Sequence, residues 1–413
     1  MSEITLTELL GLPVVDTSGV RRGRVRELAM VPHDDTLHVA SMIVRTKAGD
    51  RLIPFTALAE INGEVKTTSA ENTWQPAGDG EGLFLLERDL LDQQIIDVHG
   101  RKVVRVNDVD LYREKMQGHV SLKVASVDVG PRGAIRRLLK GIVPMSALRR
   151  LLQKIPERPI PWEFVDLIET DPARRVKLKI SHERLAKLHP ADIADIVEEL
   201  APDEREAVFE TLNEEVAAET LEEMDRKVQK SIVESLDSDR AAEIVEEMDP
   251  DAAADLLGDL PEEQTSQILQ EMEPAGRKEI SELLEYGHNT AAGRMNTDFV
   301  ALGINATMQN AIEALRRYEG GVETLSTIYI VDSQGTLVGA VPLAKLVLAD
   351  PGTPLLALTR EPLISALEDA KDQAVAELFD KYNLLTLPVV DEHKKLTGVI
   401  TSDDVIAVLR AKL

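Results

Sequence analysis

The sequence predicts a multidomain α+β protein: duplicated small β-barrels at the N-terminal end, a central all-α superhelix of short helices, and an α/β pair at the C-terminal end. Three observations predict it. A β-rich pattern occurs twice in about the first 170 residues, a twelve-residue repeat fills residues 189–284, and a strand and helix pattern occurs twice after residue 289. A length of 413 residues fits several domains, because one domain has about 100 to 200 residues.

The composition is that of a folded, acidic protein. Charged residues make up 29% and hydrophobic residues 43%, which excludes a wholly disordered chain and a collagen-like fibre. The formal net charge is −26, so the chain as a whole repels nucleic acid and attracts cations or basic partners. The absence of cysteine excludes disulfides and thiolate metal sites.

The location in the cell follows from segments that the sequence lacks. The longest stretch without a charged residue runs from Phe299 to Ile312, which is shorter than the 18 or so apolar residues of a membrane helix. The first residues have no basic start before an apolar run, so they do not resemble a secretory signal. We therefore expect a cytoplasmic protein, which could work at the inner face of the membrane.

The N-terminal element is a duplicated β-rich region, expected as one unit over residues 1–88 and a second, diverged unit over residues 89–176. Three anchors recur in the same order, namely Val14–Gly19 as Ile95–Gly100, Leu37–Ser41 as Leu122–Ser126, and Ile53–Phe55 as Ile160–Trp162. Strands joined by turns with Gly and Asp indicate small barrels. The stretch LPVVDTSGVRRGRVREL, followed by IPF, resembles the PRC-barrel family, which is known mainly as a protein-binding module.

The second unit carries a basic helical insertion at residues 131–158. Eight basic residues stand there against one acidic residue, and the apolar residues have helical spacing, which predicts two short basic amphipathic helices. Three interpretations remain open: an internal clasp on the acidic helices, a docking element for a partner or an anionic membrane, and a solubilising flap. The candidate docking residues are Arg136, Arg137, Lys140, Arg149 and Arg150.

The central element is predicted over residues 177–286 and contains eight consecutive twelve-residue blocks at 189–284, here called the repeat array. Each block ends in Leu or Met, its eighth residue is apolar except for Thr220, and Asp, Asn or Pro stands at several block starts. Each block is therefore expected to be one short helix, stacked into a superhelix. The array carries −23 of the total charge, which divalent cations would relieve, and Asp251 and Asp255 lie one turn apart on one helix face.

The C-terminal element is a tandem duplication. Thr327–Val341 aligns with Thr386–Ile400 at a constant offset, and an amphipathic helix precedes each copy. The stretch LPVVD…LTGVITSDDV resembles the CBS domain family, so CBS units are expected at 287–350 and 351–413. The resemblance implies a two-fold module that often dimerises and commonly binds adenine nucleotides. In the family's nucleotide motif, which Gly398, Thr401 and Asp404 match here, the aspartate accepts the ribose hydroxyls. Pro342 and Lys345 stand in the first copy at the positions equivalent to Thr401 and Asp404.

An acidic array that runs into a CBS pair resembles the cytosolic part of the MgtE family of magnesium transporters, over about residues 189–413. The junction EYGHNTAAGRMNTDFVAL looks like that family's junction. The resemblance implies Mg²⁺ as a ligand, held in part by Asp251, Asp255 and Asp404, and closure of the array on the CBS pair. The family's membrane pore domain is absent, and Gln373, Asn383, Ala407 and Lys412 stand where the family has acidic positions.

These observations predict a cytosolic regulatory or accessory protein that senses Mg²⁺ or another divalent cation, forms a homodimer through the CBS pair, and associates with a separately encoded membrane metal transporter. Two alternatives remain: a CBS module that binds ATP or another adenine nucleotide, and a protein-interaction scaffold without a small ligand. The sequence contains none of the HExxH, GxSxG, P-loop or GxGxxG motifs, so we do not expect an enzyme.

Overall fold

A computed structural model describes residues 2–31, 37–78, 82–116, 119–142, 148, 152, 155–169, 171, 173, 182–287, 289–318, 325–359 and 362–410. The chain forms two compact units, Met1–Met224 and Asp225–Leu413, which we describe separately. Both units mix helices and strands, so the α+β class predicted from the sequence is confirmed. Within the described ranges, no helix is long and apolar enough to cross a membrane.

The β-rich part of the first unit contains three sheets. The largest has the strand order β6-β7-β2-β3-β4-β5-β8, and β9 pairs with β3. Its strands are β2 (Pro13–Val15), β3 (Arg21–Met30), β4 (Ser41–Thr46), β5 (Gly49–Pro54), β6 (Leu58–Ile61), β7 (Val65–Thr67), β8 (Gln75–Pro76) and β9 (Phe84–Leu85).

The other two sheets have the orders β1-β12-β13-β14 and β11-β10-β15. Their strands are β1 (Ser2–Thr5), β10 (Gln94–Asp97), β11 (Lys102–Arg105), β12 (Asp108–Met116), β13 (His119–Asp128), β14 (Pro159–Pro161) and β15 (Val165–Leu167). The helices of this part are α1 (Leu6–Leu9), α2 (Leu86–Asp89) and α3 (Pro131–Leu138).

The two β-rich copies exchange equivalent pieces. Strand β1 of the first copy pairs with β12 of the second. Strand β9 lies before the predicted boundary at residue 88, but at the 81-residue offset of the first anchor it is the equivalent of β1 in the second copy, and it pairs with β3 of the first. The helix caps are exchanged in the same way: Glu27 on β3 accepts the backbone N–H groups of Glu87 and Arg88 in α2, while Asp108 on β12 accepts that of Thr7 in α1. One hydrophobic core spans both copies. The duplication is therefore present, but the copies form one interlocked body rather than two separate barrels.

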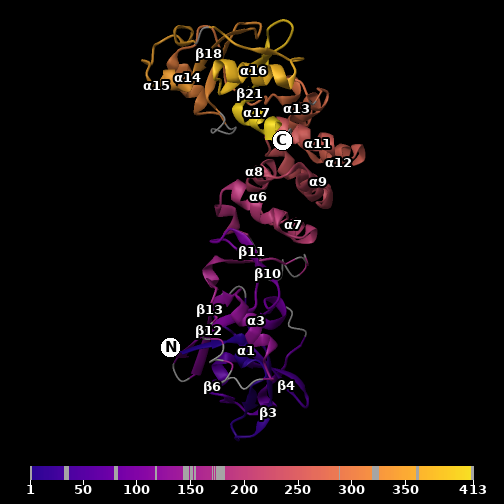
Figure 1. The fold of residues 1–413 in the computed structure, drawn as a ribbon, viewed down its shortest axis with the longest axis vertical. Coiled ribbons are helices and arrows are strands. Elements are labelled where there is room, and N and C mark those ends of the chain that lie inside the picture. The colour runs from indigo at the N-terminus through magenta and orange to yellow at the C-terminus, as the bar shows by residue number, and fades with distance from the viewer. Residues whose placement is uncertain are drawn as a thin grey trace. The chain divides into compact units, whose positions relative to one another are not determined.

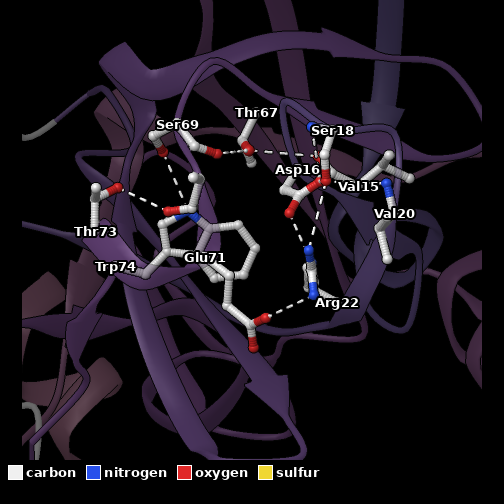
Figure 2. Close-up of polar contacts among 11 residues, drawn as sticks. Val15, Asp16, Ser18, Val20, Arg22, Thr67, Ser69, Glu71, Thr73 and Trp74 are labelled. Carbon is white, nitrogen blue, oxygen red and sulfur yellow. Dashed lines mark hydrogen bonds and ion pairs between the residues drawn. The ribbon is translucent and has the colours of Figure 1, made fainter.

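The recurring aspartate of the first copy shapes a turn (Figure 2). Oδ1 of Asp16 accepts the backbone N–H groups of Ser18 and Val20, and Oδ2 accepts Nε of Arg22 at 2.6 Å. Arg22 in turn reaches Glu71 at 3.3 Å. The Ser18 hydroxyl and these other donors lower the pKa of Asp16 to about 2 despite burial. The anchor residues of the first copy thus hold a hairpin together, which is a structural role.

The repeat array folds as predicted, with one helix for each twelve-residue block. The first unit contains α6 (Pro190–Glu198), α7 (Pro202–Phe209) and α8 (Glu214–Glu223); the second contains α9 (Arg226–Ser235), α10 (Ser238–Glu246), α11 (Pro250–Asp259), α12 (Glu262–Glu271) and α13 (Pro274–Leu284). Helices two places apart pack together, as α6 does with α8 and α11 with α13. The eighth residue of every block is buried, Thr220 included.

The C-terminal pair consists of two copies of the same small sheet. The sheets are β16 (Ala301–Gly303), β17 (Thr327–Val331) and β18 (Leu337–Pro342), then β19 (Ala366–Leu367), β20 (Thr386–Val390) and β21 (Leu396–Thr401). Their helices are α14 (Met308–Leu315), α15 (Leu343–Val347), α16 (Asp372–Tyr382) and α17 (Ser402–Arg410). Pairing registers agree at the predicted offset, since Thr327 faces Pro342 and Thr386 faces Thr401.

A short segment between α13 and the first C-terminal sheet, residues 289–300 and here called the linker, joins the array to the C-terminal pair inside the second unit; it lies at the start of the predicted first CBS unit. Its helical turn η5 (Ala292–Arg294) packs against α11, α13 and β21, so the end of the array lies beside the second copy (Figure 1). The compact units divide within the array, between Met224 and Asp225, whereas the predicted domain boundaries follow the sequence repeats. Those boundaries stay a prediction.

Candidate cation and nucleotide site

Carboxylates from the array and from the second C-terminal copy gather at the linker. Asp249 is the N-cap of α11, and its carboxylate is hydrogen-bonded to the Asn296 side chain. Asn296 is fixed in turn, because its backbone N–H and C=O pair with Val399 on β21 at 2.7 and 2.9 Å. Glu279 on α13 accepts the hydroxyl of Thr297. The linker therefore brings the start of α11 and the side of α13 toward β21.

The negative charges at this place act on one another. Together they are called the junction cluster, and they are Asp249, Glu279, Asp298, Asp403 and Asp404. Burial, with repulsion from Asp403, raises the pKa of Asp249. Burial, with repulsion from Glu279 and Asp249, raises the pKa of Asp298. A raised carboxyl pKa means that the charged form lacks compensation, so this cluster would favour a nearby cation.

Asp404 links the cluster to the predicted nucleotide motif. Burial raises the pKa of Asp404 to about 6, opposed by hydrogen bonds from Thr401 and supported by repulsion from Asp403 and Asp249. Its Oδ2 accepts both the backbone N–H and the hydroxyl of Thr401, each at 2.7 Å. Asp404, in the first turn of α17, therefore reaches back to the residue before the helix, as the third residue of a capping box does.

The other predicted metal residues lie in a different setting. On α11, Oδ2 of Asp255 accepts Nη2 of Arg226 at 2.6 Å and Nη1 of Arg294 at 2.8 Å. Asp251 lies one turn earlier and lines the same small pocket as Asp255. Among the described residues, no group of three His, Cys, Asp or Glu residues is placed to hold a metal ion directly. The metal-binding roles of Asp251, Asp255 and Asp404 stay a prediction.

The third predicted nucleotide residue has a packing role. A Cβ atom added at Gly398 would stand 2.6 Å from Cγ and Sδ of Met295, so only glycine lets the linker approach β21 this closely. The contact of Gly398 with a nucleotide stays a prediction.

A pocket opens beside this motif, between the two C-terminal copies. It is rich in hydroxyl groups, and the residues that line it are Asn296, Asp298, Phe299, Leu325, Ser326, Thr327, Tyr329, Thr386, Val399 and Thr401. The Tyr329 hydroxyl donates to Oγ1 of Thr386 at 2.9 Å, across the pseudo-two-fold axis. The pocket thus offers hydroxyl groups from both copies, and its lining includes Thr401, the hydrogen-bond partner of Asp404.

The basic insertion is bound to the N-terminal β-rich region. Arg136 is 7% exposed, and its Nη1 donates to the fully buried Asp108 at 2.6 Å. Arg137 reaches Asp92 at 2.5 Å. Burial lowers the pKa of Lys140. These partners belong to the β-rich region and not to the array, so α3 holds its own region together. Arg149 and Arg150 lie outside the described residues. Docking of a partner or a membrane by the basic insertion stays a prediction.

Sequence reasoning missed Asp249, Arg226 and Arg294. Asp249 stands at a block start, where the sequence predicts only a helix cap, whereas in the structure its carboxylate is hydrogen-bonded to Asn296 of the linker. The block that contains Arg226, DRKVQKSIVESL, is the only one of the eight with more basic than acidic residues. That local reversal of charge is a signal that could have indicated an internal partner for Asp255.

Comparisons with known proteins cover the array and the C-terminal pair. The model of the MgtE intracellular N domain matches residues 188–289, and the CBS domain model matches residues 291–352 and 357–411. The magnesium transporter MgtE of Thermus thermophilus is 35% identical over 136 residues, and that of Enterococcus faecalis is 34% identical over 131 residues. These matches span 33% and 32% of this chain but only 30% and 29% of the two relatives.

Solved structures agree with these matches. The soluble part of a magnesium transporter superposes with a TM-score of 0.53 at 28% identity, over 56% of this chain and 91% of that chain. The cytosolic domain of the Mg²⁺ channel MgtE in complex with ATP gives 0.52 at 31% identity, over 56% and 94%. No comparison tests the resemblance to PRC-barrels, which stays a prediction. Residues 188–411 of this chain therefore form an MgtE intracellular N domain followed by a CBS domain pair, the arrangement of the cytosolic domain of MgtE transporters.

Proposed function

We propose that this chain is a cytoplasmic regulatory protein of magnesium transport, in which a divalent cation closes the acidic array onto the CBS pair. The observation that carries the proposal is the junction cluster. Its carboxylates come from the array (Asp249, Glu279), the linker (Asp298) and the second CBS copy (Asp403, Asp404), and burial and mutual repulsion raise the pKa of three of them. A cation between them would relieve that repulsion and favour contact between the parts.

The cluster fits a hydrated hard cation. Mg²⁺ keeps several water ligands and needs only one or two carboxylates, with further carboxylates reached through its water. The described residues offer no ready cage for direct ligation, which agrees with binding of that kind. Asp255 fits less well, because its Oδ2 already accepts two guanidinium groups.

Small-angle scattering across Mg²⁺ concentrations at constant ionic strength tests the cation proposal. We expect the full chain to become more compact in millimolar Mg²⁺, and the variant Asp249→Asn/Asp403→Asn to lose most of that response. The control variant Glu262→Gln/Glu263→Gln removes two exposed carboxylates at the start of α12 and should respond like the wild type. Equal responses in all three proteins would reject the cluster as the sensor.

A second candidate function is adenine-nucleotide binding, which the hydroxyl groups gathered from both copies favour; the pocket that they line has room for about one water molecule and would have to widen to admit a nucleotide. A carboxylate beside such a pocket can accept the two ribose hydroxyls, and a similar cytosolic domain has been solved with ATP. Isothermal titration with ATP tests it. We expect binding that Asp404→Asn weakens and that Lys345→Gln, at the equivalent position of the first copy, leaves unchanged. No heat with either nucleotide or cation would favour the scaffold alternative.

We further propose that the CBS pair forms a homodimer and that the chain acts on a separately encoded membrane transporter. Large apolar side chains are exposed on this pair: Val347 is 82% exposed, Leu348 88% and Leu385 66%. Exposed apolar side chains of this size favour a protein interface. Sedimentation equilibrium should give a dimer that Leu348→Glu converts to a monomer; a monomeric wild type would reject the dimer.

A further inference from the structure

Asp255 lies at the centre of an ion-pair chain that crosses the second unit. Arg226 at the start of α9 and Arg294 in the linker both donate to its Oδ2, at 2.6 and 2.8 Å. Nε of Arg294 also lies 3.9 Å from Oδ1 of Asp372, the first residue of α16 in the second CBS copy. The four residues thus connect two array helices, the linker and the CBS pair.

The buried part of this chain is Arg294 with its two carboxylates. The side chains of Arg294, Asp255 and Asp372 are 18%, 19% and 9% exposed, whereas that of Arg226 is 55% exposed. Charge-assisted hydrogen bonds are stronger when water is excluded, so the contact between Arg294 and Asp255 is the strong one. Arg226 adds a second donor from the solvent side.

We propose that Arg226, Asp255, Arg294 and Asp372 form a cation-independent latch, here called the arginine latch, between the array and the CBS pair. A guanidinium group remains charged at every relevant pH and cannot diffuse away, unlike a bound metal ion. Mg²⁺ would have to displace two donors from Oδ2 of Asp255 and lose water as well. The latch therefore biases the second unit toward the closed arrangement, and the cation acts at the junction cluster alone. This inference rests on the proposed function, because it sets the cation concentration at which closure occurs.

Hydrogen–deuterium exchange on the full chain, with and without Mg²⁺, tests the latch. In Arg294→Gln we expect exchange in α11 and η5 without cation to rise roughly threefold to tenfold, the usual effect of losing one partner of a partly buried ion pair. The Mg²⁺ concentration at half-protection should rise by a similar factor. Arg317→Gln is the matched control, since Arg317 is an exposed arginine of the first CBS copy with the same charge change.

A double variant separates the latch from a simple change in local charge. Asp255→Asn/Arg294→Gln keeps the net charge of the wild type but still lacks the latch. We expect its Mg²⁺ midpoint to be at least as high as that of Arg294→Gln, because the double variant loses the Arg294–Asp255 pair and the Arg226–Asp255 pair as well. A midpoint restored to the wild-type value would overturn the latch, as would an unchanged midpoint and unchanged exchange in Arg294→Gln.

The test does not depend on one variant folding. Arg226→Gln changes an exposed side chain, and it should raise cation-free exchange of α11 by a smaller factor than Arg294→Gln. No rise in either variant would contradict the latch. If the wild type shows no response to Mg²⁺ while Arg294→Gln still exchanges faster, the proposed function fails and the latch stands. If Mg²⁺ protects all variants with one midpoint, the latch fails and the proposed function stands.

Discussion

At the residue scale, two equivalent acids show how one role can be filled in two environments. Glu27 and Asp108 occupy the same place in the two β-rich copies, and each caps a helix of the other copy. Asp108 also receives the guanidinium of Arg136. Glu27 is 5% exposed and depends on backbone N–H groups of Leu28, Glu87 and Arg88. Burial outweighs these donors and raises the pKa of Glu27 to about 7.

Glu27 should make stability fall as the pH rises. Because its folded pKa of about 7 lies above the ordinary glutamate value of 4.5, the native state binds the extra proton between these two values. The contribution is therefore full below about pH 4.5 and is lost as the pH rises toward 7, on the order of 3 kcal/mol. Calorimetric melting of Glu27→Gln should show a flatter pH dependence in this window. The same slope in both proteins would contradict the assignment.

Arg136 should matter more for stability than for docking. The substitution Arg136→Met leaves the buried Asp108 carboxylate without its partner, which costs about 3 to 5 kcal/mol. We expect the melting transition of the β-rich region to fall sharply in calorimetry. Asp108→Asn/Arg136→Met removes both charges and should recover part of the loss. Wild-type melting in the single variant would mean that Arg136 is free for a partner.

At the element scale, each array helix is specified by its own block. The eighth residue faces inward in all eight helices, because a helix of about ten residues can bury only one stripe against its neighbours. Thr220 holds this position in α8 and is fully buried, and its hydroxyl has no hydrogen-bond partner among the residues that the structure describes. The exception in the sequence pattern is therefore a site of local cost and not a break in the helix.

Replacing this hydroxyl with a methyl group should stabilise the array. Thr220→Val keeps the side-chain shape and removes an unsatisfied polar group, which is worth about 1 kcal/mol. Thr211→Val is the control, because the Thr211 hydroxyl donates to the backbone of Ala207 and Val208 and its loss should not stabilise. Urea denaturation followed by circular dichroism measures both. Stabilisation by both variants alike would point to helix propensity as the cause.

At the scale of the whole molecule, the linker decides which charges meet. It places the junction cluster and the arginine latch at the same boundary within the second unit, and in the latch the cationic groups are the side chains of Arg226 and Arg294. A divalent cation and two arginines would then share the task of holding acidic helices beside the CBS pair.

The proposed cation response should weaken in acid. Asp404 has a pKa of about 6, raised by burial, so protonation below that pH removes negative charge from the cluster and lowers its attraction for Mg²⁺. Scattering titrations at pH 7.5 and pH 5.5 should show a higher Mg²⁺ midpoint at the lower pH. In Asp404→Asn the shift between the two pH values should be smaller. An equal shift would assign the pH dependence to other groups.

The sequence by itself determined the elements whose patterns are local or repeated. It specified one helix per block, because a buried stripe recurs every twelve residues. It also specified the two CBS sheets at a fixed offset, because matching strands keep matching registers. It also singled out Asp404 through its motif. Only the tertiary structure decided the pairings between distant residues, such as Glu27 with α2 or Arg294 with Asp255. The physical reason is that hydrophobic periodicity specifies which side of an element is buried, whereas the partner of a buried charge depends on which other element packs there.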